Sequence, residues 1–254
     1  MNLSDQEYIR YSRQVMLEQV GEQGQITLKN SHIIVVGLGG LGCPALQYLA
    51  AAGIGELTLI DDDVVDLSNL QRQVLYRSNH IGKAKVEAAE QQLYGLNSQV
   101  KINAINKKVE QVNLVKLLEK AGLLLDCTDN ANSRYFINQA CQQAGVTLVS
   151  AAAIGGNGQL AVFNFNQHKS PCYRCLYPDL EQQDTALNCQ NTGVFGPVLG
   201  VMGSLQAIEA IKLLVQPGQV TANKLMLFDA WQLKFNAIKL SHNSLCPSCA
   251  TLTG

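Results

Sequence analysis

The apolar residues of this chain fall into short runs with strand character and longer segments with helical spacing. Short runs that are β-branched or alternate with polar residues predict strands at 33–36, 56–60, 100–105, 123–125, 147–150 and 159–166. Segments with helical spacing lie between most of them, at 44–52, 83–96, 114–121 and 133–144. The pattern therefore predicts an α/β fold with Rossmann-like β-α-β units and a largely parallel sheet, which antiparallel strands at 224–229 and 232–240 complete.

The rest of the chain predicts helices and loops around this sheet. Residues 1–30 are expected to be helical, with Ser4 and Glu7 at the spacing of a capping box. Residues 151–158 are rich in alanine and glycine and predict a loop, and the polar stretch 176–193 predicts a longer one. The segment 195–215 is apolar on most sides, which indicates a helix in the core or at an interface.

A glycine-rich turn joins the first predicted strand to its helix. It reads GLGGLG at 37–42, and Asp61 follows about 20 positions later, at the end of the second strand. Glycines let the backbone approach a phosphate, and a helix N-terminus offers free N–H groups there. A lone glycine motif is often only a tight turn, but the flanking strands and the spaced carboxylate favour nucleotide binding.

A polar and cationic run follows this unit. It reads SNLQRQ at 68–73, and Lys83 and Lys85 come shortly afterwards. Cationic side chains beside a phosphate site indicate a triphosphate and neutralisation of charge at a reacting phosphorus. Each residue alone could be part of an ordinary solvated loop, whereas the set as a whole favours a reactive phosphate site.

A second acidic cluster, DCTDN at 126–130, follows the predicted strand 123–125. Ligands of open parallel sheets bind at the carboxyl ends of the strands, so Asp129 is expected to share a crevice with the glycine turn. The alternative role for Asp129 is to cap the helix that is predicted to begin near Asn132.

Four of the eight cysteines form two C-x-x-C pairs. Cys172 and Cys175 are separated from Cys246 and Cys249 by 70 residues, so a shared site would join two distant segments. Four thiolates in two such pairs suit tetrahedral zinc in a closed, structural site; unrelated buried or redox cysteines are the alternative. The cysteines of the apolar segments are expected to be small buried hydrophobic residues: Cys43, Cys127 and Cys141.

The composition excludes several classes of protein. Of the 254 residues, 47% are hydrophobic and 15% charged, and the net charge of −1 gives no bulk electrostatic case for nucleic acid or an anionic membrane. The polar start, MNLSDQEYIRYSRQ, is not a signal peptide, and no apolar run is expected to reach transmembrane length. Eight cysteines without a secretion signal indicate reduced thiols, so we expect a cytoplasmic protein.

Several of these motifs together resemble a known family. The segments RYSRQ, GLGGLG, DDDVVDLSNLQRQ and DCTDN, the lysine of the next helix and the terminal cysteines are similar to the ThiF/MoeB/HesA family of ubiquitin-activating-enzyme-like adenylyltransferases. The resemblance covers almost the whole chain. It implies one domain over 1–254, with N-terminal helices at 1–30, an ATP-binding half at 31–150, and a carrier-binding half with the zinc site at 151–254.

The resemblance also implies a reaction. ATP adenylates the C-terminal glycine carboxylate of a small ubiquitin-like sulfur-carrier protein that ends in Gly-Gly, either ThiS-type for thiamine or MoaD-type for molybdopterin, and pyrophosphate is released. Expected ions are Mg²⁺ and structural Zn²⁺. The sulfur is expected to come from a separate donor, a cysteine desulfurase or a rhodanese, because no rhodanese-like segment follows Gly254. The family further implies a homodimer in which Arg13 reaches an ATP site, commonly across the interface.

The residues that carry this expected chemistry form three groups. The catalytic group is Arg13, Arg72, Lys85, Asp129 and Cys189. The ATP-binding group is Gly37, Gly39, Gly40, Gly42, Asp61, Asp63, Ser68, Asn69, Gln71, Arg72, Lys85, Asp129 and Asn130. The metal ligands are Cys172, Cys175, Cys246 and Cys249 for Zn²⁺, and Asp129 for Mg²⁺.

Three questions stay open at this level. Cys189 lies in the long polar loop, where it is either a thiol placed for covalent transfer or a loop cysteine without a role. The segments DDD, CLYPD and NCQNTGVFGP look closer to the thiamine branch, and SDQE and LGCPALQYLA closer to the molybdenum branch. An NAD-linked oxidoreductase and a non-catalytic binding module are the rival classes; SNLQRQ and the cysteine pairs argue against the first, and Arg72, Lys85 and Asp129 against the second.

Overall fold

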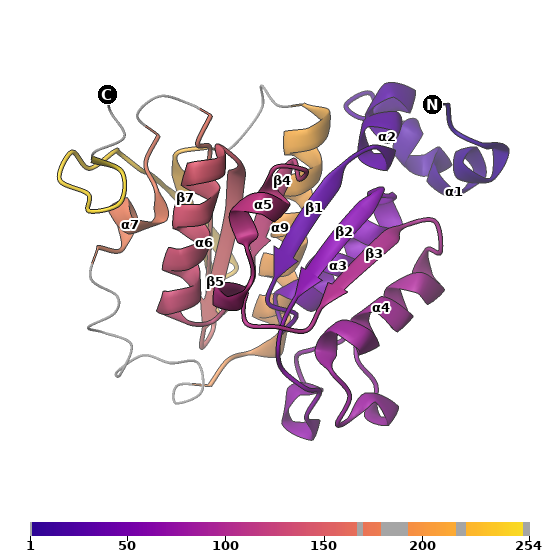
Figure 1. Cartoon of the computed structure of the whole chain (residues 1–254), viewed down its shortest axis with the longest axis horizontal. Helices are drawn as coiled ribbons and strands as arrows, with labels where there is room; N and C mark the ends of the chain where they lie inside the picture. Colours follow the sequence, from indigo (N-terminus) through magenta and orange to yellow (C-terminus); the bar gives the residue numbers. More distant parts are fainter. Residues whose placement is uncertain (1, 167–169, 179–192, 217–221, 251–254) are drawn as a thin grey trace.

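The fold is built on one mixed sheet of eight strands in the order β3-β2-β1-β4-β5-β6-β7-β8 (Figure 1). We describe it from a computed structural model that covers residues 2–166, 170–178, 193–216 and 222–250. The strands are β1 His32–Val36, β2 Glu56–Ile60, β3 Lys101–Ile105, β4 Leu123–Asp126, β5 Thr147–Ile154, β6 Asn157–Phe163, β7 Lys224–Asp229 and β8 Lys234–Lys239. Strands β1 to β5 pair in parallel and β5 to β8 in antiparallel fashion, which confirms the predicted fold class.

Helices connect the parallel strands and cover both faces of the sheet. The described helices are α1 Asp5–Val15, α2 Gly21–Lys29, α3 Gly42–Ala52, α4 Lys85–Leu96, α5 Leu114–Leu118, α6 Ala131–Ala144, α7 Tyr173–Leu176 and α9 Gly196–Val215. Short 3₁₀ turns are η1 Leu67–Asn69, η2 Ser78–His80 and η3 Val109–Gln111. The predicted capping box of α1 is present, because Ser4 Oγ accepts from the N–H of Glu7 and Glu7 Oε2 accepts from the N–H of Ser4.

The two-residue period of β1 divides the core into two clusters. Ile33 and Val35 pack with α3, α4 and α9 on one face, whereas Ile34 and Val36 pack with α5 and α6 on the other. Since both faces of the strand are covered, its residues form a continuous apolar run rather than an alternating one. This burial holds the carboxyl end of β1, where the glycine turn begins, in a fixed position.

The prediction of a loop at 151–158 is wrong, because β5 continues to Ile154 and forms a hairpin with β6. Its residues are small because α9 packs directly over them: Ala151 and Ala153 are buried in the same cluster as Met202. A Cβ at Gly158 would lie 2.5 Å from Met202 Cγ. The alanine and glycine content thus reflects close packing under a helix rather than a break in the strand.

Helix α9 also differs from expectation. With 20 residues, the helix is long and apolar enough to cross a membrane, judged by length and composition alone. No apolar run of that length was expected from the sequence. The helix packs against α3, β5 and β6, and 44% of its most apolar window is buried. A core helix passes the same test of length and composition, so this is weak evidence for a membrane span, and the packing favours a core helix.

Candidate active site

A large cleft lies along the carboxyl ends of the parallel strands. Its volume is about 1150 Å³, above the roughly 300–1,000 Å³ that is usual for a single small-molecule pocket. The turns that follow β1, β2 and β4 line it, and β1 and β4 flank the point where the strand order reverses. Open α/β sheets bind ligands at this point, and the volume leaves room for a second substrate beside a nucleotide.

The glycine turn after β1 forms one wall of the cleft. Gly37 has a φ of 86°, and a Cβ there would lie 2.7 Å from the carbonyl oxygen of Cys127. At Gly39, by contrast, a Cβ would meet only Gln73 Nε2, at an ordinary contact distance of 3.6 Å. Gly37, Gly39 and Gly40 line the cleft, whereas Gly42 lies outside its lining and packs against the carbonyl of Gly37. The backbone is therefore exposed to a ligand at Gly39.

Asp61 fixes the shape of this turn. Its Oδ2 accepts from the N–H of Leu38 at 2.7 Å, and its Oδ1 accepts from the N–H of Asp63 at 2.8 Å. Burial raises the pKa of Asp61, and the charge of Lys85 offsets part of that effect. Asp61 lines the cleft, so it combines a structural role with a carboxylate that a ligand can reach.

Two cations approach the same wall. Lys85, the first residue of α4, is buried, and its Nζ lies 2.7 Å from Oδ2 of the exposed Asp63. Arg72 donates from Nη1 to the carbonyl of Ser68 at 3.1 Å. Ser68 itself is outside the cleft lining and donates its hydroxyl hydrogen to Asp66. The members of the predicted group that line the cleft on this side are Asp63, Asn69, Gln71, Arg72 and Lys85.

The DCTDN segment follows β4, the strand next to β1, and forms the part of the cleft beside the glycine turn. Helix α6 begins at Ala131, and Asn130 caps it by accepting from the N–H of Ser133 at 2.9 Å. The alternative role of Asp129 as the cap is therefore wrong. Asp129 is exposed and lines the cleft, as expected from its position after β4.

A buried network around Asp126 and Arg134 holds the DCTDN segment in place. The carboxylate of Asp126 accepts from the N–H of Thr128 at 3.0 Å and from the Ser150 hydroxyl at 2.8 Å. Arg134 lies 3.5 Å from Asp126 and donates to the carbonyls of Thr128 and Ala151. Burial opposes the charge of Arg134, yet Asp126 raises the pKa of this guanidinium above its ordinary value. Arg134 thus remains charged and holds the turn that carries Asp129.

Besides Gly42 and Ser68, one described residue of the predicted catalytic and ATP-binding groups lies outside the cleft lining, and the position of a second is not described. Arg13 is exposed on α1, which lies beside the end where β1 begins, away from the glycine turn (Figure 1). It is not among the residues that line the cleft of its own chain. Cys189 lies outside the described residues.

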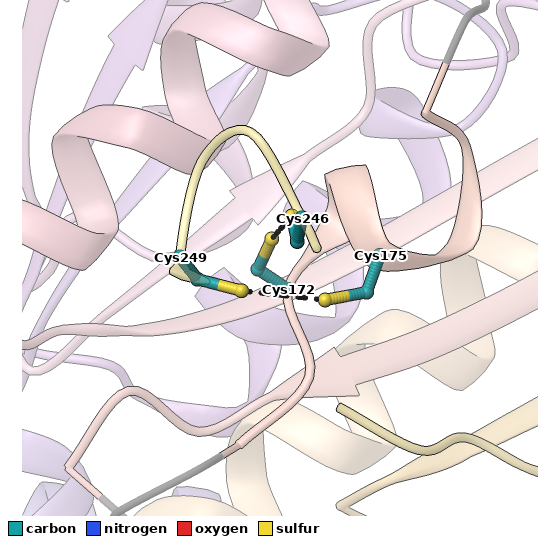
Figure 2. Close-up of side chains that lie close together, drawn as sticks. All are labelled: Cys172, Cys175, Cys246 and Cys249. Atoms are coloured by element: carbon teal, nitrogen blue, oxygen red, sulfur yellow. Dashed lines mark hydrogen bonds between the residues drawn. The ribbon is translucent and has the colours of Figure 1, made fainter. Parts of the chain in front are cut away.

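The four paired cysteines meet at one place (Figure 2). Cys172 Sγ lies 3.6 Å from Cys246 Sγ, Cys175 Sγ lies 3.3 Å from Cys249 Sγ, and all four sulfur atoms lie within 4.8 Å of one another. Tetrahedral zinc with bonds of about 2.3 Å separates its sulfur ligands by about 3.8 Å, so the cluster fits this ion. The other three described cysteines are buried away from it, as expected: Cys43, Cys127 and Cys141.

Two lysines and two tyrosines are among the cleft residues that escaped the sequence analysis. Lys107 and Lys108 line it just after β3, and they could have been found because they follow the carboxyl end of a predicted strand. Tyr173 and Tyr177 line it from α7 and the residue that caps its end. No local pattern identifies these two tyrosines, since only the fold brings α7 to the cleft.

Comparison with known proteins agrees with this geometry. The model of the ThiF family matches residues 11–248. The molybdopterin-synthase adenylyltransferases of Salmonella typhimurium and Escherichia coli are 45% and 46% identical over 247 residues, which are 97% of this chain and 98% of each relative. The adenylyltransferase and sulfurtransferase MOCS3 of Culex quinquefasciatus is 42% identical over 98% of this chain, which spans only 56% of that relative.

Solved structures give the same fold. The crystal structure of E. coli MccB with ATP superposes with a TM-score of 0.80 at 25% identity, over 94% of this chain and 73% of that one. The structure of E. coli MccB with AMPCPP and SeMet MccA gives a TM-score of 0.75 at 25% identity, over 89% of this chain and 68% of that one.

Proposed function

This chain belongs to the ThiF family, and we propose that its cleft binds ATP and the C-terminal glycine of a MoaD-type sulfur-carrier protein for adenylation. The chain is an adenylyltransferase, in agreement with relatives that match it over nearly their full length. The observation that carries the proposal is that Arg72, Lys85 and Asp129 line one cleft together with the glycine turn. The names of the nearly full-length relatives favour the molybdenum branch over the thiamine branch.

The chemical difficulty is the approach of one anion to another. A carboxylate oxygen of the carrier attacks the α-phosphorus of ATP, the bond from that phosphorus to the bridging oxygen of pyrophosphate breaks, and pyrophosphate leaves with its electron pair. Arg72 and Lys85 neutralise charge that builds up on the phosphate oxygens, and this stabilises the transition state more than bound ATP. The shared fold with E. coli MccB, which was solved with ATP, supports ATP as the nucleotide of this cleft.

Two metal ions complete the proposal. The Asp129 carboxylate lines the cleft and is the oxygen ligand that would hold Mg²⁺, which supplies further charge neutralisation when bound. The four cysteines would hold Zn²⁺, which joins α7 to the C-terminal segment and leaves no ligand position for substrate.

We also propose a homodimer with composite sites. Arg13 lies outside the cleft of its own chain, so its predicted catalytic role requires a second copy. Helix α9 presents the half-exposed Ile208 beside other partly buried apolar residues, which supports a further contact surface. The division into an ATP-binding half and a carrier-binding half, a cytoplasmic location, a separate sulfur donor and a covalent role for Cys189 belong to the same proposal.

The test is ATP–pyrophosphate exchange with a purified MoaD-type carrier, followed by the intact mass of the carrier. Exchange that depends on the carrier's terminal Gly-Gly supports the function, and its absence with both MoaD-type and ThiS-type carriers would contradict it. Mixing Arg13→Ala with Asp129→Ala subunits should restore partial exchange if Arg13 acts across the dimer. No restoration in a mixture shown to contain heterodimers would limit Arg13 to its own subunit or to no role.

A further inference from the structure

A second part of the cleft, which we call the aromatic end, differs in chemistry from the end at the glycine turn. Its lining there comes from Tyr173, Tyr177, Gln159 and the β5–β6 hairpin residues Ala152 and Ala153. These residues supply aromatic rings, an amide and small side chains, and the cation beside them, Arg134, is buried in the network with Asp126.

Two of the clustered cysteines, Cys172 and Cys175, belong to the short helix α7 and its N-cap. The tyrosines of α7 and its C-cap, Tyr173 and Tyr177, form what we call the aromatic wall. Tyr173 directly follows Cys172, and Tyr177 comes two positions after Cys175. The helix is only four residues long, so its own backbone hydrogen bonds are too few to fix it. A metal bound to all four sulfur atoms would anchor both ends of this turn to the C-terminal segment (Figure 2).

Tyr173 connects the cysteine cluster to the Arg134 network that supports the turn carrying Asp129. Its N–H donates to Asn138 Oδ1 at 2.8 Å, and its ring centroid lies 5.8 Å from the guanidinium carbon of Arg134. Arg134 in turn donates to Ala151 and Thr128, two residues that lie on the sheet and in the DCTDN turn. A continuous set of contacts therefore leads from the cysteines to the cleft.

Tyr177 makes the second connection. Its hydroxyl donates to Gln159 Oε1 at 2.6 Å, and its carbonyl accepts from the hydroxyl of Tyr135, also at 2.6 Å. Gln159 pairs with Ala152 across the β5–β6 hairpin, and both residues line the cleft. The hydrogen bond to Gln159 therefore fixes Tyr177 to the sheet at the cleft. A shift of α7 would break this bond and move the wall.

We propose that the four-cysteine site positions Tyr173 and Tyr177 as the wall against which the C-terminal segment of the carrier lies. The proposal rests on the proposed function and deepens it, because it assigns the zinc site to recognition of the second substrate. Both tyrosines are positioning residues and take no part in the chemical step. The bond from Tyr177 to Gln159 is separate from the ATP contacts at the glycine turn and from the Arg134 network under Asp129, so loosening Tyr177 changes carrier binding much more than ATP binding.

The test compares Tyr177→Phe with Tyr94→Phe, which alters an exposed tyrosine on α4 outside the cleft. Tyr177→Phe removes only the bond to Gln159, so the KM for a MoaD-type carrier should rise about three- to ten-fold while the Kd for ATP stays within about two-fold. Tyr94→Phe should change neither. An unchanged carrier KM, or an equal loss of ATP affinity, would overturn the proposal.

A second measurement does not depend on the carrier. Removing the metal with a chelator should increase amide hydrogen exchange in residues 172–177 and 126–130 while exchange in β1 and α3 stays as in the metal-bound protein. Faster exchange confined to the cysteine segments, or spread evenly over the chain, would overturn the coupling. If wild-type protein shows no pyrophosphate exchange with any carrier, the proposed function fails, whereas this exchange pattern still decides whether the cysteine site positions the cleft wall.

Discussion

The two ends of the cleft are assembled in different ways. The glycine-turn end takes its main groups from one continuous stretch, 37–85, and its bonds are local: Asp61 to Leu38, and Lys85 to Asp63. The aromatic end takes Arg134 from α6, Gln159 from β6, and Tyr173 and Tyr177 from α7 and its C-cap, next to a four-cysteine cluster whose two pairs are separated by 70 residues. The cationic groups at the glycine-turn end are thus encoded locally, whereas the aromatic side chains of the cleft come together only in the completed fold.

This difference predicts that damage at one end leaves the other intact. The glycine turn is fixed by strand ends that are buried on both faces, so it does not need the cysteine cluster. The aromatic end is held by contacts that converge on α7 and Arg134. Mutations can therefore separate ATP binding, adenylation and carrier recognition.

The largest expected effect is on adenylation at the glycine-turn end. Lys85→Ala and Arg72→Ala should each lower the rate of carrier-dependent pyrophosphate exchange by about 10²–10³-fold, because their interactions strengthen in the transition state. ATP affinity, measured by calorimetry, should fall much less. Lys83→Ala is the matched control, since Lys83 is exposed and outside the cleft lining. A near-normal exchange rate in either variant would remove that residue from the chemistry.

The sequence predicts the first end well because its signals are contiguous. GLGGLG, Asp61 and Lys85 lie within two β-α units, whose strands are recognisable from apolar runs. The cysteine pairs were also predicted, since the short C-x-x-C spacing is visible despite the long gap. The order of the strands, the hairpin at 151–158 and the two tyrosines were not, because each depends on contacts between distant segments such as α9 over β5.

The next effect concerns the metal at the aromatic end. Cys246→Ser should abolish zinc binding, measured as metal per chain, and lower the Tm by about 2–4 °C for each kcal/mol of stability lost. ATP affinity should fall much less than metal binding, because the glycine turn keeps its own contacts and only the turn at 126–130 loosens. Cys141→Ser is the control, because Cys141 is equally buried but lies outside the cluster and should keep the metal. Loss of ATP affinity in step with the metal would contradict the separation of the two ends.

A smaller effect is expected from the ribose side of the nucleotide. Asp61→Ala removes a carboxylate that can accept from ribose hydroxyls, and each such bond contributes about 0.5–1.5 kcal/mol. It also leaves the N–H of Leu38 without its present acceptor, so the glycine turn loosens. Calorimetry should show weaker ATP binding and an unchanged Kd for the carrier alone. Unaltered ATP affinity would exclude Asp61 from the nucleotide site.

The smallest expected effect is the pH dependence of stability that the buried carboxylate of Asp61 causes. Burial raises its pKa in the folded protein above the ordinary value of about 3.9. A group with a raised folded pKa contributes stability that is fully present below its unfolded pKa and is lost as pH rises through the folded pKa. The Tm of the unchanged protein minus that of Asp61→Asn should therefore decrease as pH rises from about 4 toward neutrality. The carboxylates whose pKa is lowered, such as Glu7 and Glu56, act with the opposite sign but are common to both proteins, so they cancel in the difference. A difference that is flat, or that increases with pH, would show that the hydrogen bonds from Leu38 and Asp63 outweigh the burial of the Asp61 carboxylate.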